Sequence, residues 1–288
     1  MAIKLQTIRD IRNFITSELA SLYPPRETES IAMIILTHVF KDKTRAQLLS
    51  NDEVETGSRK TDAIIRYCRD LKKGKPVQYV TGETEFYGCR LKVSPGVLIP
   101  RPETEELVDL VIKENNNFQG KIIDIGTGTG AIAINLALNL PAARVTATDN
   151  SVRALRIAAE NAVINHAHVT FVKADILKSD TKMSESFDLI VSNPPYVRYS
   201  EMLLMNRNVL DFEPHRALFV SDNDPLKFYR AIFNFAEEAL SPGGKIYYEI
   251  NEAMGMQIRK LSELFNYRDI RILKDINGKD RFLHCGKS

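Results

Sequence analysis

The sequence has few of the residues that build disulfides or metal sites. Its 288 residues include only three cysteines, Cys68, Cys89 and Cys285, and no Cys-x-x-Cys pair. This odd, widely spaced set argues for reduced, buried thiols and against a structural zinc site. The five histidines form no set at metal-ligand spacing, so no bound metal is expected.

Long apolar runs and a strong net charge are also missing. No run approaches the roughly 20 apolar residues that a membrane span needs, and Met1–Gln6 has no apolar signal region, so we expect a cytoplasmic protein without a membrane partner. The net charge of +2 is too small to indicate a nucleic-acid binder. Residues 1–75 hold 14 Lys and Arg against 10 Asp and Glu, which fits either an anionic partner or an ordinary solvated surface.

What the chain does contain is typical of a soluble globular protein, with 44% hydrophobic and 26% charged residues. The length suits one large α/β domain plus a smaller one. In residues 1–75 the apolar residues recur at helical spacing, which predicts helices over 4–22, from Pro25 to Val39 and over 62–73. These helices would form a small bundle with their apolar stripes facing one another.

After residue 75 the pattern changes to short pieces separated by glycine, which predicts a β-hairpin linker over residues 76–100. Pro102 and the acidic residues after it suit the first turn of a helix that runs to about Glu114. Arg101, just before this turn, is either part of the capping arrangement or a ligand-binding residue.

From Lys121 onward, strand and helix patterns alternate, which predicts a mostly parallel sheet with helices on both faces. The turn Asn277-Gly278 joins the last two strands, so the C-terminal edge of the sheet should be antiparallel. The predicted strands are residues 121–125, 144–148, 169–173, 189–192, 245–250, 270–273 and 281–284.

An apolar strand that ends at Ile125 runs directly into Gly126, Gly128 and Gly130, and a helix follows over 131–138. Glycines there allow positive φ and close approach of a ligand to the backbone. The spacing differs from the Gly-x-Gly-x-x-Gly of dinucleotide-binding folds, and no phosphate-binding Lys follows. With Asp124 before it, the Gly-x-Gly-x-Gly loop favours a nucleoside that carries an amino-acid tail.

Acidic residues end the next two predicted strands. Asp149 could accept both hydroxyls of a ribose or could cap the following helix. Asp175 could accept a hydrogen bond from an adenine amine or could be a turn residue. Because open α/β sheets bind ligands at the carboxyl ends of their strands, the agreement of these positions with the glycine loop favours a ligand site.

The apolar run Phe187–Val191 ends at Ser192-Asn193-Pro194-Pro195-Tyr196. The two prolines have no N–H and a fixed φ, so the chain leaves the strand along a stiff path whose carbonyls are free to accept hydrogen bonds. Such acceptors beside one amide side chain suit a planar NH₂ group. The alternative interpretation is that Asn-Pro-Pro only terminates the strand.

Taken together, these motifs resemble the class I S-adenosylmethionine-dependent methyltransferases. Within that class the chain is similar to the release factor glutamine methyltransferase family, which methylates the glutamine side chain in a Gly-Gly-Gln loop of peptide-chain release factors. The resemblance covers nearly the whole chain, and the segments that carry it are 80–82, 86–88, 98–105, the glycine loop, 193–196 and 212–214. One departure is Ile176, where many members have an aromatic residue.

The resemblance implies a seven-stranded Rossmann-like sheet in the order 3-2-1-4-5-7-6 over residues 101–288, with residues 1–75 as a substrate-recognition domain. It implies S-adenosylmethionine as cofactor, class 1 release factors as partners, and a monomer. The implied cofactor-binding residues are Asp124, Gly126, Thr127, Gly128, Thr129, Gly130, Asp149, Asp175, Ile176 and Asn193.

The resemblance also assigns the transfer step. Asn193 and Pro194 would accept the two N–H bonds of the substrate amide, and Tyr196 would pack against its plane, so these three residues are the implied catalytic set. Pro195 and Glu213 complete the implied substrate-binding residues. Glu213 lies in residues 197–224, a long connection that the sequence predicts to be irregular.

Two other functions were compared with this one. An adenine-N6 nucleic-acid methyltransferase shares the Asn-Pro-Pro-Tyr motif, but it needs a flipped-base pocket and a basic groove. Residues 76–288 hold 25 basic against 27 acidic residues, which disfavours a nucleic-acid substrate. A catalytically silent S-adenosylmethionine-binding module is the other alternative, and the intact 193–196 motif argues against it.

Overall fold

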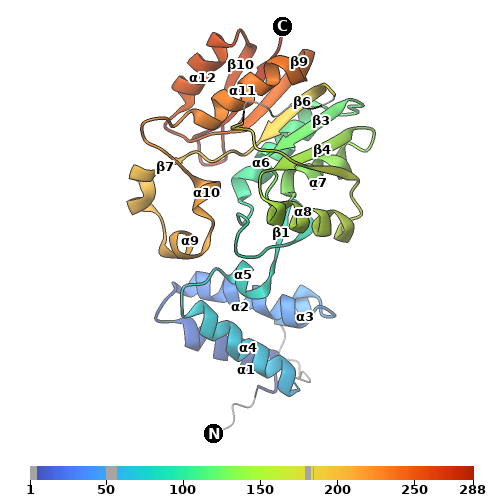
Figure 1. The fold of residues 1–288 in the computed structure, drawn as a ribbon. Coiled ribbons are helices and arrows are strands. Elements are labelled where there is room, and N and C mark those ends of the chain that lie inside the picture. The colour runs from blue at the N-terminus through green and yellow to red at the C-terminus, as the bar shows by residue number, and fades with distance from the viewer. Residues whose placement is uncertain (1–4, 50–56, 179–182, 184) are drawn as a thin grey trace. The chain divides into compact units, whose positions relative to one another are not determined.

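The computed structural model describes residues 5–49, 57–178, 183 and 185–288, and the chain divides into two compact units (Figure 1). The smaller unit contains residues 1–82 and 206–212, and the larger contains residues 83–205 and 213–288. Within the described ranges, no helix is both long enough and apolar enough to cross a membrane.

The smaller unit is helical, which confirms the prediction for the N-terminal region. In α1 a capping box begins the helix, because Thr7 Oγ1 accepts the N–H of Asp10 and the Asp10 carboxylate accepts the N–H of Thr7, both at 3.0 Å. The apolar stripe of α1 is fully buried in the core of this unit. The helices are α1 (Ile8–Leu19), α2 (Pro25–Val39), α3 (Arg45–Leu49), α4 (Ser58–Leu71), α5 (Val77–Thr81) and α9 (Arg207–Phe212).

The helix boundaries differ from the sequence prediction in ways that have local causes. Helix α1 starts later than predicted because Thr7 caps it, and residue 4, the predicted start, lies outside the described residues. The helix predicted over 62–73 begins four residues earlier, at Ser58. Helices α3 and α5 were not predicted, because five residues are too few to show a helical period. Helix α5 lies in the segment predicted as a linker.

The larger unit begins with the predicted hairpin. Strands β1 (Glu83–Phe86) and β2 (Cys89–Lys92) pair antiparallel. Tyr87 and Gly88 both have positive φ, as a two-residue type I′ turn requires. Tyr87 is held in this unusual conformation by its N–H, which donates to the Glu105 carboxylate at 2.7 Å.

The main sheet has seven strands in the order β10-β11-β9-β6-β3-β4-β5, which is the predicted order, and β11 pairs antiparallel with both β10 and β9. Parallel pairing joins β5 to β4, β4 to β3, β3 to β6 and β6 to β9. The bounds are β3 (Lys121–Ile125), β4 (Arg144–Asp149), β5 (Val169–Lys173), β6 (Phe187–Ser192), β9 (Leu240–Glu249), β10 (Arg268–Lys274) and β11 (Asp280–Gly286).

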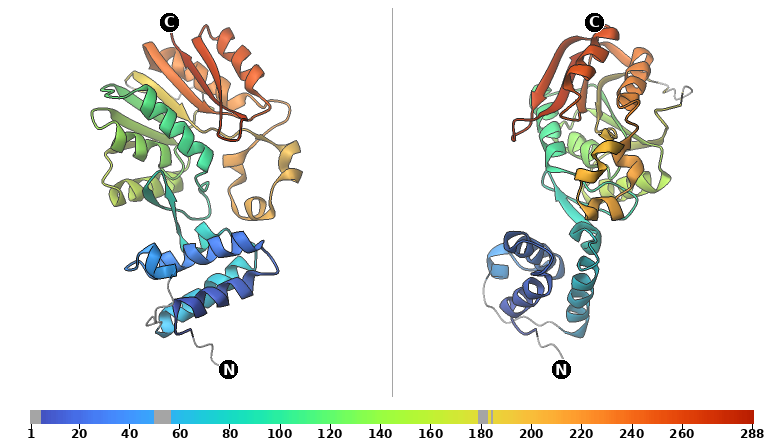
Figure 2. Two further views of the ribbon diagram at one scale, coloured as in Figure 1. Left: turned by 180° about the vertical axis from the view of Figure 1, so that it is seen from behind. Right: turned by 90° about the vertical axis from the view of Figure 1, so that its left-hand side faces the viewer.

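Helices cover both faces of this sheet (Figures 1 and 2). On one face, side chains of α6 (Pro102–Glu114), α7 (Ala131–Asn139) and α8 (Val152–Ile164) form a core with alternate strand residues such as Ile122. On the other face, α11 (Lys227–Ala239) and α12 (Gly255–Leu264) pack on the residues between them, such as Ile123. Two separate apolar cores thus hold the central strands between helix layers.

The connection over residues 197–224 is more ordered than the sequence predicted. It contains β7 (Val197–Arg198), the 3₁₀ helix η1 (Tyr199–Leu204), α10 (His215–Leu218) and β8 (Phe219–Val220), as well as α9 of the smaller unit. Strands β7 and β8 pair in parallel. The prediction of an irregular loop was wrong because each of these elements is too short to show its period in sequence.

All three cysteines are free and buried, as the sequence predicted. Burial raises the pKa of Cys68 to about 11 and also raises the pKa of Cys89 and Cys285. Thiols in this condition stay protonated at neutral pH and are poor nucleophiles.

The last glycine of the glycine loop brings the start of α7 close to α8. Gly130 has a φ of +83°, and a Cβ added there would lie 3.1 Å from the Cβ and 3.3 Å from the Cα of Ala158. A side chain at this position would therefore push the two helices apart.

We expect Gly130→Ala to lower the free energy of unfolding by about 2–4 kcal/mol, since it combines left-handed backbone strain with overpacking. Gly278→Ala is a matched control, because Gly278 has a φ of +77° and open space around an added Cβ. It should cost only the backbone term, about 1–2 kcal/mol. Urea denaturation of both variants measures the difference, and equal losses would show that the contact with Ala158 is unimportant.

Candidate active site

The carboxyl ends of β3, β4, β5 and β6 surround one cavity of about 280 Å³ in the larger unit. Further walls come from Gly96–Leu98, which follow the hairpin, and from α10 and α11. Of the residues predicted from sequence, those that line the cavity are Gly126, Gly128, Asp149, Asp175, Ile176, Asn193, Pro194 and Pro195. Those that do not line it are Asp124, Thr127, Thr129, Gly130, Tyr196 and Glu213.

The glycine loop crosses the end of β4 with its backbone facing the cavity. The N–H groups of Gly126 and Thr127 both donate to the carbonyl of Thr148 at 2.9 Å. Gly126 and Gly128 have positive φ, and a Cβ added to either would meet no atom within 4 Å. The loop is therefore a cradle with open space where other residues would carry side chains, as a ligand close to the backbone requires.

Asp124 supports this loop from within the core. Its side chain is fully buried, and its Oδ2 accepts a hydrogen bond from Thr127 Oγ1 at 2.6 Å. Burial raises the pKa of Asp124 to about 7, although the Thr127 hydrogen bond opposes the shift. Thr127 and Thr129 are also buried, and the Thr129 carbonyl accepts from Asn161 of α8 at 2.9 Å. These three residues fix the shape of the loop.

Asp149 joins the glycine loop to the start of α8. Its Oδ2 accepts the N–H of Gly128 at 3.0 Å, and its Oδ1 accepts the N–H of Ser151 at 2.8 Å. Ser151, and not Asp149, is the N-cap of α8, because its Oγ accepts the N–H of Ala154. Burial raises the pKa of Asp149, while hydrogen bonds and the Arg216 charge oppose that shift. The carboxylate borders the cavity and keeps further lone pairs for a ligand.

Arg216 was not singled out from the sequence. It lies in α10, lines the cavity, and donates from Nη2 to Ser151 Oγ at 2.9 Å. The sequence did offer one signal for Arg216 as a site residue, because it lies shortly after segment 212–214, which carries the family resemblance. The site therefore has one cation beside the Asp149 carboxylate.

Asp175 and Ile176 follow β5 and are both half-buried. Asp175 Oδ1 accepts the N–H of Leu177 at 3.1 Å, so the residue does shape a turn. Ile176 packs against the core on the α11 face. Both also line the cavity, where Ile176 supplies apolar cover without an aromatic ring.

Residues 193–196, which we call the Asn193 loop, face the glycine loop across the cavity. Ser192 Oγ donates to the carbonyl of Ile125 at 2.6 Å, which ties the end of β6 to the end of β3. Asn193 is half-buried, and its Nδ2 donates to Thr104 Oγ1 at 3.0 Å. Pro194 is buried and Pro195 half-buried. This arrangement places the Asn193 loop and the glycine loop at the same cavity.

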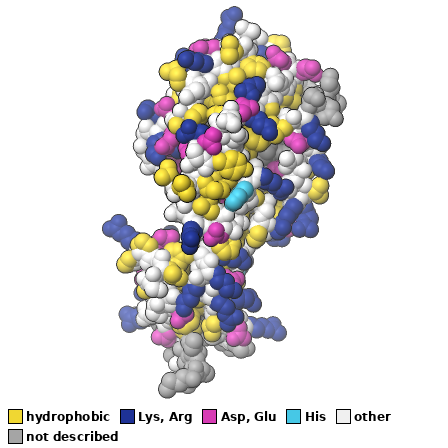
Figure 3. All heavy atoms as spheres, turned by 60° about the vertical axis from the view of Figure 1, so that its left-hand side comes forward, with side chains coloured by type: hydrophobic (Ala, Val, Ile, Leu, Met, Phe, Trp, Pro, Cys, Tyr) yellow, Lys and Arg dark blue, Asp and Glu magenta, His cyan; other side chains and the backbone are white. Residues whose placement is uncertain are grey.

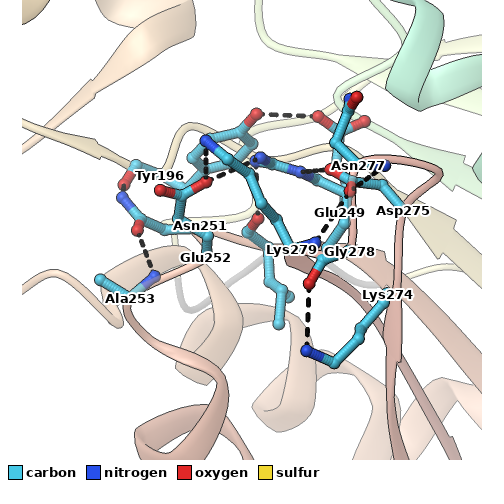
Figure 4. Close-up of polar contacts among 12 residues, drawn as sticks. Tyr196, Glu249, Asn251, Glu252, Ala253, Lys274, Asp275, Asn277, Gly278 and Lys279 are labelled. Carbon is cyan, nitrogen blue, oxygen red and sulfur yellow. Dashed lines mark hydrogen bonds and ion pairs between the residues drawn. The ribbon is translucent and has the colours of Figure 1, made fainter.

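Tyr196 turns away from the cavity toward a buried acid at the end of β9. Its Oη donates to Glu249 Oε1 at 2.8 Å, and the Tyr196 carbonyl accepts from Asn251 Nδ2 at 3.2 Å (Figure 4). The other oxygen of Glu249 accepts from Thr104 Oγ1 at 2.6 Å. Burial raises the pKa of Glu249, and the Thr104 and Tyr196 hydrogen bonds oppose the shift.

Glu213 and Arg101 form an ion pair. Glu213 Oε1 accepts from Arg101 Nη2 at 2.5 Å, and Glu213 Oε2 accepts the N–H of Ile99 at 3.1 Å. The Glu213 side chain is 1% exposed. Both of its oxygens thus have protein partners, and they link the segment after the hairpin to the segment before α10. Arg101 precedes α6 but makes no side-chain cap there.

Sequence reasoning did not single out Thr104 or Glu249 as site residues. Glu249 had a visible signal, because it is an acid within the run Ile246-Tyr247-Tyr248-Glu249-Ile250, whose other members are apolar or aromatic. Thr104 lies in the family segment 98–105, but nothing local distinguishes it from its neighbours.

The surface next to the Asn193 loop is apolar and exposed. In η1, which follows that loop, Tyr199 is 52% exposed, Leu203 93% and Leu204 86%. Figure 3 shows hydrophobic side chains gathered on one face of the larger unit. Such exposed apolar groups mark a surface suited to contact with another protein.

Two family models and several relatives of known name match this chain. A family model described as a methyltransferase small domain matches residues 104–210, and one described as the PrmC N-terminal domain matches residues 10–82. The release factor glutamine methyltransferase of Bacteroides thetaiotaomicron is 45% identical, over 96% of this chain and 99% of its own. That of Flavobacterium psychrophilum is 43% identical, over 96% and 98%.

Solved structures show the same fold at low identity. A methyltransferase from Pyrococcus furiosus matches with a TM-score of 0.53 and 19% identity, over 80% of this chain and 99% of that one. The 16S rRNA N2 G1207 methyltransferase of T. thermophilus, solved with AdoMet and guanosine, matches with a TM-score of 0.52 and 17% identity, over 72% of this chain and 50% of that one.

Both regions of the chain are thus matched by family models, and the relatives are similar along nearly its full length. The chain belongs to the release factor glutamine methyltransferase family of S-adenosylmethionine-dependent methyltransferases.

Proposed function

We propose that this protein transfers a methyl group from S-adenosylmethionine to the side-chain nitrogen of the glutamine in the Gly-Gly-Gln motif of class 1 peptide-chain release factors. The observation that carries the proposal is the single cavity shared by the glycine loop and the Asn193 loop. Such a substrate, which acts at the ribosome, implies a cytoplasmic enzyme, and we expect it to act as a monomer.

The glycine-loop side of the cavity suits the cofactor. The open backbone at Gly126 and Gly128 admits close approach of the amino-acid tail, and the Asp149 carboxylate can accept from the two ribose hydroxyls. Asp175 and Ile176 would border the adenine. Asp124, Thr127, Thr129 and Gly130 contribute by holding the loop in shape. When bound, S-adenosylmethionine supplies a methyl group that its sulfonium has already activated.

The Asn193 side of the cavity suits a carboxamide. An amide nitrogen is a poor nucleophile because its lone pair is delocalised, and the rotation barrier of about 18–20 kcal/mol for a peptide indicates how strongly. With Nδ2 bonded to Thr104, the Asn193 side chain has Oδ1 left to accept one substrate N–H, and the Pro194 carbonyl would accept the other. Two fixed acceptors would orient the nitrogen and stabilise positive charge as it develops there.

The remaining predicted substrate residues have supporting places in this proposal. Pro195 lines the cavity and can contact the substrate amide. Tyr196 does not line the cavity, so we assign it to holding the Asn193 loop in place through the bond from its hydroxyl to Glu249. Glu213 is engaged by Ile99 and Arg101, so we assign it to shaping the cavity wall.

The exposed side chains of η1 favour a protein over a nucleic acid as substrate. Tyr199, Leu203 and Leu204 are apolar, whereas a nucleic-acid surface next to the site would need Lys and Arg to contact phosphates. A protein loop can bury such apolar groups when it enters the site.

Incubation of the purified protein with methyl-labelled S-adenosylmethionine and a release factor should place label on the glutamine of the Gly-Gly-Gln motif. The matched control is the same release factor with that glutamine replaced by Ala, which should stay unlabelled. Label on added DNA or RNA, with none on the release factor, would overturn the proposal in favour of a nucleic-acid methyltransferase.

Asn193→Ala should lower turnover by roughly 10²–10³, the usual loss when one preorganised transition-state partner is removed. Cofactor affinity should change little, because the glycine loop and Asp149 stay intact. Asn139→Ala is a folding control, since it removes an amide bonded to the backbone of its own helix, α7, at 2.9 Å. Turnover close to that of the control would exclude Asn193 from catalysis.

Asp149→Ala should weaken cofactor binding by roughly 10- to 100-fold, because it removes a charged acceptor worth about 1.5–3 kcal/mol per hydrogen bond. Isothermal titration calorimetry with S-adenosylmethionine measures the effect. Asp188→Ala removes a similar carboxylate near the starts of β3 and β6, away from the cavity, where it accepts the N–H of Lys121 at 2.8 Å. This variant should bind S-adenosylmethionine normally. Equal affinities for the two variants would limit Asp149 to a structural role.

A further inference from the structure

Beneath the Asn193 loop lies a carboxylate whose hydrogen-bond partners are hydroxyl groups. Glu249 is 0% exposed, and its two oxygens accept from Thr104 and Tyr196. None of the ion pairs found in the described part of the chain includes Glu249. A buried charge of this kind is costly, and apolar residues usually fill such space with no loss of stability. Its position beside the Asn193 loop indicates that Glu249 holds that loop in place.

The direction of the hydrogen bonds around Glu249 follows from counting protons. An ionised carboxylate can only accept, and a threonine hydroxyl has a single proton to donate. Thr104 Oγ1 donates to Glu249 Oε2 at 2.6 Å, which uses the threonine's one proton, and the Thr104 and Tyr196 hydrogen bonds and the Arg281 charge all favour the ionised carboxylate. Thr104 can then only accept from Asn193, 3.0 Å away.

This constraint determines which end of the Asn193 amide faces the substrate. The two ends of an amide side chain are nearly equal in size, so packing alone distinguishes them poorly. Because Thr104 needs a donor, the NH₂ end of Asn193 turns to Thr104 and the carbonyl end is left for the substrate. If the amide were reversed, its N–H groups would face the N–H groups of the substrate amide.

The second oxygen of Glu249 fixes the other end of the same loop. Tyr196, three residues after Asn193, donates to Oε1 at 2.8 Å. Glu249 is itself held by Tyr229 Oη, which donates to its backbone carbonyl at 3.1 Å. One carboxylate is thus bonded directly to Tyr196 (Figure 4) and, through Thr104, to Asn193.

We infer that Glu249 and Thr104 are positioning residues that set the orientation of the Asn193 amide, so that its oxygen accepts from the substrate glutamine. The inference rests on the proposed function of Asn193. It goes beyond that proposal, because it assigns the orientation of the acceptor to a buried acid and a hydroxyl that lie outside the cavity lining.

Glu249→Gln tests the orientation with little change in shape. Tyr196 can still donate to the oxygen of the new amide, which places its NH₂ against Thr104. Thr104 then accepts there and its own proton is released, so it can either accept from Asn193 or donate to it, and the Asn193 amide is no longer held in one orientation. We expect kcat on the release factor to fall roughly 10- to 100-fold, as for loss of a charged hydrogen bond. The KM for the release factor and the affinity for S-adenosylmethionine should change less than about threefold.

Thr104→Val and Thr104→Ser form a matched pair. Valine has the shape of threonine without the hydroxyl and should lower kcat as Glu249→Gln does, whereas serine keeps the hydroxyl and should retain kcat within about threefold. Ser262→Ala removes a buried hydroxyl that donates to the backbone of its own helix, α12, at 2.9 Å, and it should leave kcat unchanged. Thermal denaturation identifies the folded variants.

The outcomes separate the inference from the proposed function. If the wild-type protein does not label the release factor, the proposed function is wrong. If the wild type is active and Glu249→Gln turns over at the wild-type rate, the orientation inference is wrong. An equal loss in Thr104→Ser and Thr104→Val would also overturn it, because the hydroxyl would then not be the operative group. Should Thr104→Val not fold, Glu249→Gln decides the question alone.

Discussion

Parallel pairing of β3 with both β4 and β6 is the constraint on which the rest of the site depends. Asp124 of β3 pairs with Ala147 on one side and with Val191 on the other, so the three strands end at nearly the same level. The strand ends therefore bring the glycine loop, Asp149 and the Asn193 loop together, and no long side chain is needed to reach the cavity. The Ser192 hydrogen bond to Ile125 keeps the two loops in this register.

Buried acids shape both sides of the cavity. Asp124 holds the glycine loop through Thr127, Asp149 joins that loop to α8, and Glu249 anchors the Asn193 loop. Burial raises the pKa of each of these carboxyl groups, and hydroxyl or N–H donors oppose the shift in every case. Hydrogen bonds from such donors are directional, so each buried acid fixes the geometry of the loop that it contacts.

The sequence predicted most of the sheet because its strands are short runs rich in apolar and β-branched residues. Residues 121–125 and 169–173 match β3 and β5 in full, and the Asn277-Gly278 turn located the antiparallel edge. Strands of two residues, such as β7, and helices of four to six residues, such as α10, left no period to detect. In the site, the glycine spacing located the cradle, while the Thr104–Glu249 contact joins residues 145 positions apart and has no local signal. The roles of individual site residues stay predictions.

The place of Glu249 in the chain has a consequence for biosynthesis. Most of the residues proposed to bind the cofactor, from Asp124 to Ile176, lie at the ends of three neighbouring strands that are synthesised before β9. The Asn193 loop, in contrast, obtains its anchor only when β9 has been made and has paired with β6. A partly synthesised chain could thus form the cradle before it could orient a substrate amide. On the proposed roles of Asn193 and Glu249, methyl transfer requires β9 as well as the strands that carry the cofactor-binding residues.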